Sequence, residues 1–129
     1  MNYSYTKKID LPFDEALDEV RFWFIEKWFW VVSNIDISEK IQTKVDKDFK
    51  KYIVLWFCNP ELAYKYLSYS KDLGVFMPCS VAIYENDDWV YVSAWLPEWM
   101  LPSDINNEEL SILSKEITNS IKSAIDEIK

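Results

Sequence analysis

The strongest pattern in the sequence is an apolar stripe near its C-terminal end. Apolar residues recur there every three or four positions, the spacing that places side chains on one face of an α-helix. Asn106 and, three residues later, Glu109 form a capping box that can begin this helix. Such a helix is stable when its apolar face is buried, so other segments must supply a matching surface. The stripe consists of Leu110, Leu113, Ile117, Ile121, Ala124 and Ile128.

Residues 89–96 predict a β-strand whose two faces differ in character. One face is aliphatic, and the other is large and amphipathic. Another β-prone run covers residues 79–84, and the turn-forming residues 85–88 separate the two runs. We expect the two strands to form a hairpin. The aliphatic face holds Val90, Val92, Ala94 and Leu96, and the other holds Trp89, Tyr91, Ser93 and Trp95.

Three further strands are predicted before the hairpin, at residues 3–9, 30–37 and 52–57. The run at 52–57 is apolar at every position, so both of its alternating faces are apolar. We therefore expect this strand at the centre of the sheet, covered on both sides.

Helices are predicted between these strands. Pro12 followed by two acidic residues is typical of a helix start, and this helix should extend to about Trp28. Ser38 is expected to cap a short helix, and Asn59, followed by proline, is expected to cap the next. Gly74, the only glycine in the chain, is expected to end that segment with a positive φ.

The predicted order of elements, β-α-β-α-β-α-β-β-α, describes an α+β fold. A chain of 129 residues normally completes a single core, so we expect one compact domain over residues 1–129. Hydrophobic residues make up 50% of the chain, enough apolar surface to offset the conformational entropy lost on folding. We therefore expect about five strands packed by helices.

Charge and composition argue against several function classes. The net charge is -8, and the densest lysine cluster, at residues 44–51, is interrupted by Asp46 and Asp48, so nucleic acid is not an expected partner. Without histidine the chain cannot form a Ser-His-Asp or Cys-His pair or an imidazole metal site. Two cysteines can build a four-thiolate site only together with a second copy of the chain, so a metal bridged between subunits is a minor alternative. No motif indicates a cofactor. No run suits a signal peptide or a membrane span, so we expect a cytoplasmic protein with no membrane partner.

Cys58 and Cys79 are the residues whose chemistry could define a reaction. Cys58 precedes a predicted helix, and the N-terminal end of a helix favours a thiolate. If their strands are antiparallel neighbours, the two thiols lie at one end of the sheet and can share a pocket, with Glu61 nearby as an acid or base. The alternative is that both thiols are small buried apolar groups and that Glu61 only complements the helix dipole.

The aromatic residues are unusually numerous, with seven Trp, eight Tyr and seven Phe. Residues one or two apart lie on different faces of a helix, so the aromatic side chains at 23 and 28–30 cannot all point inward. Exposed aromatic patches commonly mark a subunit interface, a ligand groove or a membrane-facing site, of which self-association is the simplest explanation here. The segment 95–102 is a second candidate patch. The candidate interface residues are Trp28, Phe29, Trp30, Trp95 and Trp99.

Two motifs resemble a known family. They are Cys58-Asn59-Pro60-Glu61-Leu62-Ala63 and the run at residues 77–85, which contains Pro78-Cys79-Ser80-Val81. With residues 12–16 and 96–101, they are similar to the prokaryotic domain-of-unknown-function family number 302. The resemblance implies an antiparallel curved sheet with helices on it, of the TATA-binding-protein-like type, and homodimers. It implies no established activity.

The chain departs from that family at two positions. The family tends to place a glycine where the first helix ends, whereas this chain has Trp28. A left-handed cap is costly for tryptophan, so we expect the helix to run longer or to end differently. The second departure is Ser80, where the family more often has asparagine.

Two functional hypotheses follow. The first is a dimeric binding module with a small-molecule pocket and no enzymatic activity. The second is a thiol-dependent redox or sulfur-handling enzyme that uses Cys79, Cys58 or both. The residues expected to line the pocket are Cys58, Asn59, Glu61, Cys79 and Ser80.

Overall fold

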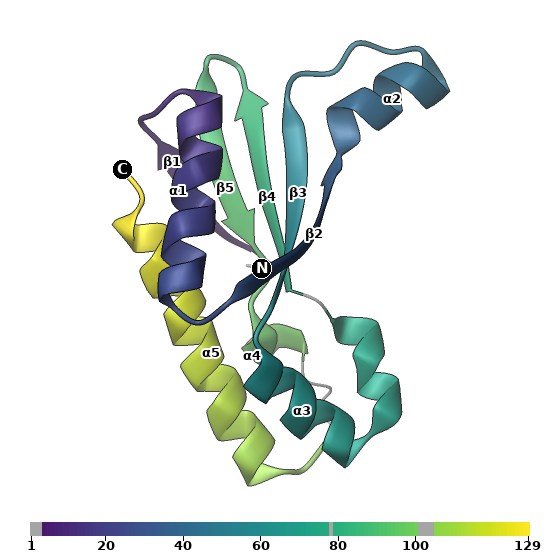
Figure 1. The fold of residues 1–129 in the computed structure, drawn as a ribbon, viewed down its shortest axis with the longest axis vertical. Helices are drawn as coiled ribbons and strands as arrows, with labels where there is room; N and C mark the ends of the chain where they lie inside the picture. The colour runs from purple at the N-terminus through teal and green to yellow at the C-terminus, as the bar shows by residue number, and fades with distance from the viewer. Residues whose placement is uncertain (1–3, 78, 101–104) are drawn as a thin grey trace.

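Five strands form one antiparallel sheet in the order β1-β5-β4-β3-β2 (Figure 1). The computed structural model describes residues 4–77, 79–100 and 105–129. The α+β class and the predicted order of elements are confirmed. The strands are β1 (Tyr5–Ile9), β2 (Trp30–Asp36), β3 (Tyr52–Cys58), β4 (Cys79–Asn86) and β5 (Trp89–Ala94).

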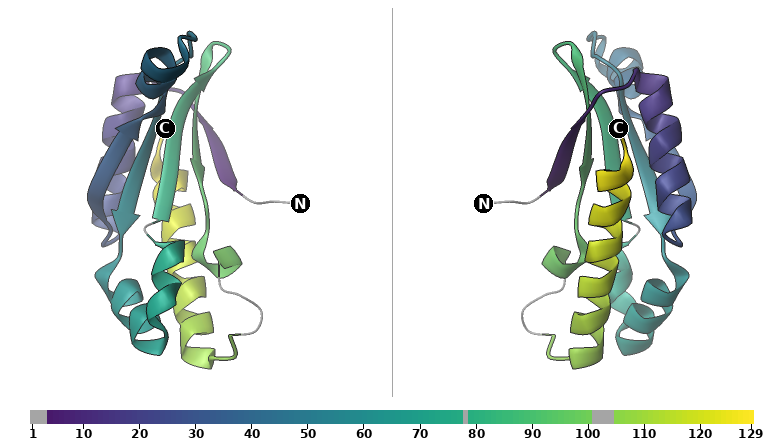
Figure 2. Two further views of the ribbon diagram at one scale, coloured as in Figure 1. Left: turned by 90° about the vertical axis from the view of Figure 1, so that its right-hand side faces the viewer. Right: turned by 90° about the vertical axis from the view of Figure 1, so that its left-hand side faces the viewer.

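The two longest helices pack side by side against one face of the sheet, and Figure 2 shows both on the same side of the strands. They are α1 (Phe13–Glu26) and α5 (Glu108–Glu127). The helix α3 (Pro60–Tyr69), the 3-10 helix η1 (Lys71–Phe76) and the short α4 (Pro97–Met100) lie at the end where β3 finishes. The helix α2 (Ile37–Val45) projects from the other end, beyond β2.

The core lies between these two helices and the sheet. All six residues of the predicted C-terminal stripe are buried, and so are the four residues of the aliphatic face predicted for 89–96. Both predictions are confirmed. Full burial of one aliphatic side chain stabilises a fold by about 1.5–3 kcal/mol, so these two surfaces together account for much of its stability.

The central strand departs from its prediction. β3 lies between β4 and β2, but only one of its faces is covered. Leu55 and Phe57 are buried, whereas Tyr52, Val54 and Trp56 remain partly exposed on the opposite face. The prediction of cover on both sides is wrong, because large aromatic residues with a polar group can occupy a half-exposed face.

Helix caps agree with the sequence to within two residues. Asn59 caps α3 as predicted, its Oδ1 accepting the backbone N–H three residues ahead at 3.1 Å. Asp36, not Ser38, caps α2, and Asn107, not Asn106, caps α5, each accepting the equivalent N–H. Neighbouring residues that share capping chemistry make such one- or two-residue errors common.

Gly74 does not end the third helical segment. α3 ends at Tyr69, followed by Ser70 in an extended conformation, and Gly74 lies inside η1 without a positive φ. The predicted hairpin is confirmed, with a tighter turn in which Asp87 has φ 56°. The chain therefore uses aspartate rather than glycine for a left-handed turn.

Some predictions extend to residues that the structure does not describe. These are Tyr3 of the first strand, Pro78 of the second motif, and Leu101 and Pro102 of the candidate apolar segment.

The end of α1 overturns the prediction made from Trp28. The helix stops at Glu26, and Trp28 adopts a left-handed conformation with φ 70°. The N–H of Trp28 donates to the carbonyl of Ile25, and the N–H of Phe29 donates to that of Phe24, both at 3.0 Å. The rings of Phe24 and Phe29 lie 5.6 Å apart between centroids. These contacts form a Schellman motif, and they outweigh the cost of about 1–2 kcal/mol for a side chain in this conformation.

Replacement of Trp28 should therefore separate backbone strain from side-chain contact. We expect Trp28→Gly to have a free energy of unfolding about 1 kcal/mol higher than Trp28→Ala, because only glycine relieves the left-handed strain. Both variants remove the indole, so the difference reports the backbone alone. Urea unfolding followed by circular dichroism measures it. Equal stability of the two variants would contradict the strain.

Candidate functional site

The sheet face opposite α1 and α5 carries an aromatic surface, which we call the open face. Tyr52, Tyr84 and Tyr91 are register neighbours on β3, β4 and β5. Their rings stack with centroid separations of 5.1 and 5.8 Å and interplanar angles of 16° and 17°. Stacked cross-strand aromatic pairs stabilise a sheet and give its face a fixed shape.

A shallow cavity of about 560 Å³ occupies the middle of the open face. We call it the open-face cavity. Its lining combines aromatic rings and small apolar groups with serine and tyrosine hydroxyls, and none of the described residues that line it is charged. The lining residues are Ser4, Tyr52, Val54, Trp56, Ser80, Ala82, Ser93, Ala94 and Trp95.

Hydrogen bonds fix the polar groups of this cavity. Trp56 Nε1–H donates to Ser80 Oγ at 3.0 Å. Ser93 Oγ lies 2.8 Å from Thr6 Oγ1 and 2.9 Å from the Tyr84 hydroxyl. The side chains are therefore ordered before any ligand arrives, which lowers the entropic cost of binding.

The structure brings one of the five predicted pocket residues to this cavity. Ser80 lines it, whereas Cys58, Asn59, Glu61 and Cys79 do not. Asn59 is occupied as the cap of α3. Glu61 lies on the exposed side of the first turn of α3 and borders a separate hollow of about 160 Å³. This position suits the dipole role that the sequence left open for it.

The two cysteines lie at the same end of neighbouring antiparallel strands, as the sequence argument required. Phe57 is the register partner of Cys79, so Cys58 follows directly after that pair. Because successive side chains of a strand alternate, the pairing turns Cys79 toward the helices and Cys58 toward the open face. Cys79 is buried, Cys58 is partly exposed, and both are free thiols.

The surroundings of both thiols disfavour ionisation. Burial raises the pKa of Cys79 to about 12, with a further contribution from the neighbouring Cys58. Burial also raises the pKa of Cys58. A thiol activated for catalysis requires the opposite shift, so neither cysteine has the electrostatics of a nucleophile.

The aromatic interface residues divide between surface and core. Trp28 and Trp30 are 73% and 51% exposed, and Trp95 and Trp99 are also exposed. Phe29 is only 1% exposed, because its ring packs on Phe24 inside the core. The expected interface role of Phe29 is therefore wrong.

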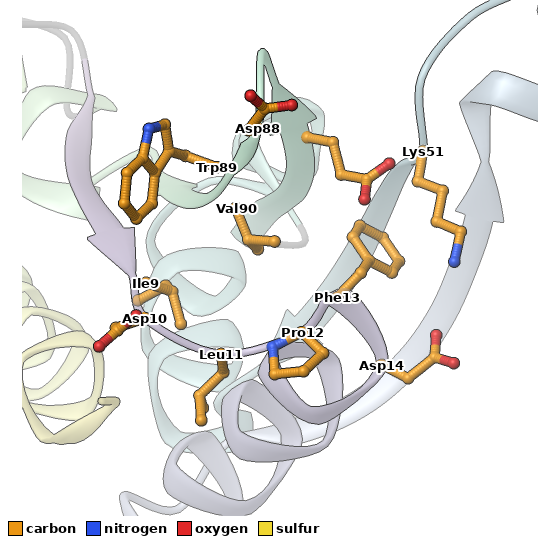
Figure 3. Close-up of a pocket in the computed structure, with 11 residues that line it drawn as sticks. Ile9, Asp10, Leu11, Pro12, Phe13, Asp14, Lys51, Asp88, Trp89 and Val90 are labelled. Carbon is orange, nitrogen blue, oxygen red and sulfur yellow. The ribbon is translucent and has the colours of Figure 1, made fainter.

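A second cavity, of about 520 Å³, lies between the β1–α1 connection and the β4–β5 turn (Figure 3). In Figure 3 the carboxylates of Asp10, Asp14 and Asp88 point in different directions. Within residues 4–77, 79–100 and 105–129, no group of three or more His, Cys, Asp or Glu side chains is placed to hold a metal ion. Among the described residues, this cavity therefore offers no metal site.

Sequence reasoning missed the open-face cavity but had a signal for it. The second face of β3 and the amphipathic face of β5 lie on the same side of the sheet, and the strand β4 separates them. The sequence marks both faces as apolar or aromatic, and together they form most of the cavity lining.

None of the helices in the described part of the chain is long and apolar enough to span a membrane.

Comparisons with known proteins agree with the resemblance seen in the sequence. The crystal structure of an uncharacterized conserved DUF302 protein from Bacillus stearothermophilus superimposes with a TM-score of 0.90 over 100% of both chains, at 19% identity. At that identity the likeness establishes the fold alone. Curated proteins give no match. The model of DUF302, a domain of unknown function, matches residues 5–128, and the chain therefore belongs to the DUF302 family.

Proposed function

We propose that this chain is a small-molecule binding module whose site is the open-face cavity. The observation that carries the proposal is an uncharged, aromatic-lined hollow of about 560 Å³ on an otherwise uncovered sheet face. Ligand cavities typically have volumes of about 300–1,000 Å³ and combine apolar walls with a few fixed polar groups. Large apolar patches are seldom left exposed on a protein surface without a binding role.

The lining also indicates the class of ligand. A charged group in this cavity would lose water without gaining an ionic partner, which costs several kcal/mol or more. Anions are further disfavoured by the net charge of -8. The proposed ligand is therefore flat, mainly apolar and uncharged, so that it can contact the rings of Trp56 and Trp95.

Naphthalene is a suitable neutral probe for this site. We expect its addition to shift the indole N–H signals of Trp56 and Trp95 saturably in two-dimensional NMR spectra, because both rings line the cavity. The signal of Trp89, whose ring lies beneath the Lys8 ammonium at 3.2 Å, should move little. Each signal is assigned by a Trp→Phe variant.

A blocking variant tests the location. Ala82→Glu places a long charged side chain in the cavity and should weaken naphthalene binding at least about tenfold, since burying a carboxylate is costly. Val75→Glu, on the exposed surface of η1, is the matched control and should bind as the wild type does. Equal shifts of the NMR signals of all exposed indoles, or unchanged naphthalene binding by Ala82→Glu, would contradict the proposal.

A second copy of the chain is the proposed protein partner, at the outer edge of β2. β2 pairs with β3 alone, so the backbone groups on its other side are free to pair. It contains no Lys, Arg or Pro, although a bulge interrupts its register with β3 between Val31 and Ser33. Trp30 and Val32 are exposed on it, and the adjacent α2 has no buried residue. Exposed apolar edges of this kind commonly pair with another chain.

A lysine on this edge should prevent association. We expect the wild type to be a dimer by light scattering at tens of micromolar, and Val32→Lys to be a monomer, because charge on an edge strand opposes pairing. Val75→Lys replaces another exposed valine away from the edge and should remain dimeric. A monomeric wild type would exclude the dimer, and a dimeric Val32→Lys would move the interface elsewhere.

The raised thiol pKa values favour a binding module over a thiol-dependent enzyme. We expect iodoacetamide at pH 7.5 to modify Cys79 only when the protein unfolds, and Cys58 no faster than free cysteine. Mass spectrometry of the alkylated peptides measures both rates. Rapid modification of either thiol in the folded protein would restore the enzyme hypothesis.

The same shift predicts a dependence of stability on pH. The pKa of Cys79 is higher in the folded state than in the unfolded state. The contribution of Cys79 to the free energy of unfolding is therefore complete below about pH 8.5 and falls as the pH rises toward 12. The difference in free energy of unfolding between wild type and Cys79→Ala should therefore shrink above about pH 9. A constant difference would contradict the raised pKa.

A further inference from the structure

The hydroxyl of Ser80, which lines the open-face cavity, acts as an acceptor in its hydrogen bond with Trp56. An indole N–H can only donate, so Ser80 Oγ accepts the hydrogen bond from Trp56. The proton of Ser80 must then point to another group. No acceptor for it is found among the residues that the structure describes. Ser80 therefore presents a free O–H donor to the cavity that it lines.

The other hydroxyls of the cavity are less available for this role. Ser93 Oγ has two hydroxyl partners within the protein, Thr6 Oγ1 and the Tyr84 hydroxyl, and either can donate to it or accept from it. Tyr52 lies four residues from Trp56 along β3, so their Cα atoms are about 13 Å apart. One ring cannot contact both the Tyr52 hydroxyl and the Ser80 hydroxyl.

Two indoles flank the Ser80 hydroxyl. Trp56 is the register partner of Ser80 on β3, and the backbone N–H of Trp95 donates to the Ser80 carbonyl at 3.4 Å from the β5 side. Strands two positions apart in a sheet are separated by about 10 Å. Both indoles line the cavity, so a planar ring bound there can contact each of them.

We infer that the open-face cavity binds a planar, uncharged ring that carries a hydrogen-bond acceptor, such as a ring nitrogen or a carbonyl oxygen. This inference rests on the proposed function and specifies its ligand. The ring contacts Trp56 and Trp95, and its acceptor accepts a hydrogen bond from the Ser80 hydroxyl. A ring without an acceptor leaves the covered hydroxyl unpaired, which weakens its binding.

Naphthalene and quinoline test this inference, because they have the same shape and differ by one ring nitrogen. Quinoline is uncharged at pH 8, and its nitrogen accepts but cannot donate a hydrogen bond. Water hydrates that nitrogen, so the probes are compared across variants rather than with each other. Ser80→Ala alone would release the Trp56 N–H as a substitute donor, so the comparison is made in the Trp56→Phe background.

We expect Trp56→Phe with Ser80→Ala to bind quinoline about tenfold more weakly than Trp56→Phe alone, while naphthalene binds at least as tightly as before, because it no longer leaves a hydroxyl unpaired. NMR titration of the Trp95 indole signal measures all four dissociation constants. Ser93→Ala in the Trp56→Phe background is the matched control, since it removes a hydroxyl that has two hydroxyl partners within the protein, and it should not weaken quinoline binding selectively.

The outcomes separate this inference from the proposed function. If both rings bind at the cavity but loss of the Ser80 hydroxyl affects them equally, the acceptor requirement is wrong and the binding module stands. If neither ring binds the wild type at the cavity, the proposed function itself fails. If Ser93→Ala selectively weakens quinoline binding, then Ser93 rather than Ser80 donates the hydrogen bond, and the inference is wrong.

Discussion

Packing of α1 and α5 on a single face of the sheet is the constraint on which the rest of the structure depends. Side chains of a strand alternate between two faces, so burying Leu55, Ile83 and Val92 beneath the helices forces their neighbours to the other side. Those neighbours include Trp56 and Tyr84, which carry polar groups that tolerate partial exposure. The open face is thus a direct consequence of how the core is built, and the same register that buries the aliphatic residues aligns the tyrosine stack.

The elements that the sequence predicted best are those in which a single face is apolar. The stripe of α5 and the alternation in β5 each specify which side is buried, and both agree with the structure. The run in β3 is apolar on both faces, so its periodicity does not distinguish full cover from a half-exposed aromatic face. The conformation of Trp28 was beyond propensity rules for a different reason, because tertiary contact between Phe24 and Phe29 overrides the local preference.

Prediction of the site failed at the level of register. Antiparallel pairing of β3 with β4 was anticipated, and it does bring the two cysteines to one end of the sheet. The sequence does not fix which residue of β3 pairs with Cys79. A shift of the strand register by one residue would exchange the two faces of β3. In the observed register Phe57 opposes Cys79, so the thiols turn apart. Ser80, directly after Cys79, turns to the open face instead, and it is the one predicted pocket residue that lines the cavity.

The two proposed binding surfaces are geometrically compatible. β2 continues the sheet beyond β3, with Ser33 opposite Trp56 and Trp30 opposite Cys58. Strand addition takes place in the plane of a sheet, so a second copy paired along β2 would extend the open face without covering it. The opposite arrangement, in which two open faces pack together, would bury the cavity and exclude a ligand. Compatibility of the two sites therefore depends on the association using backbone groups at the edge of β2 rather than the aromatic face.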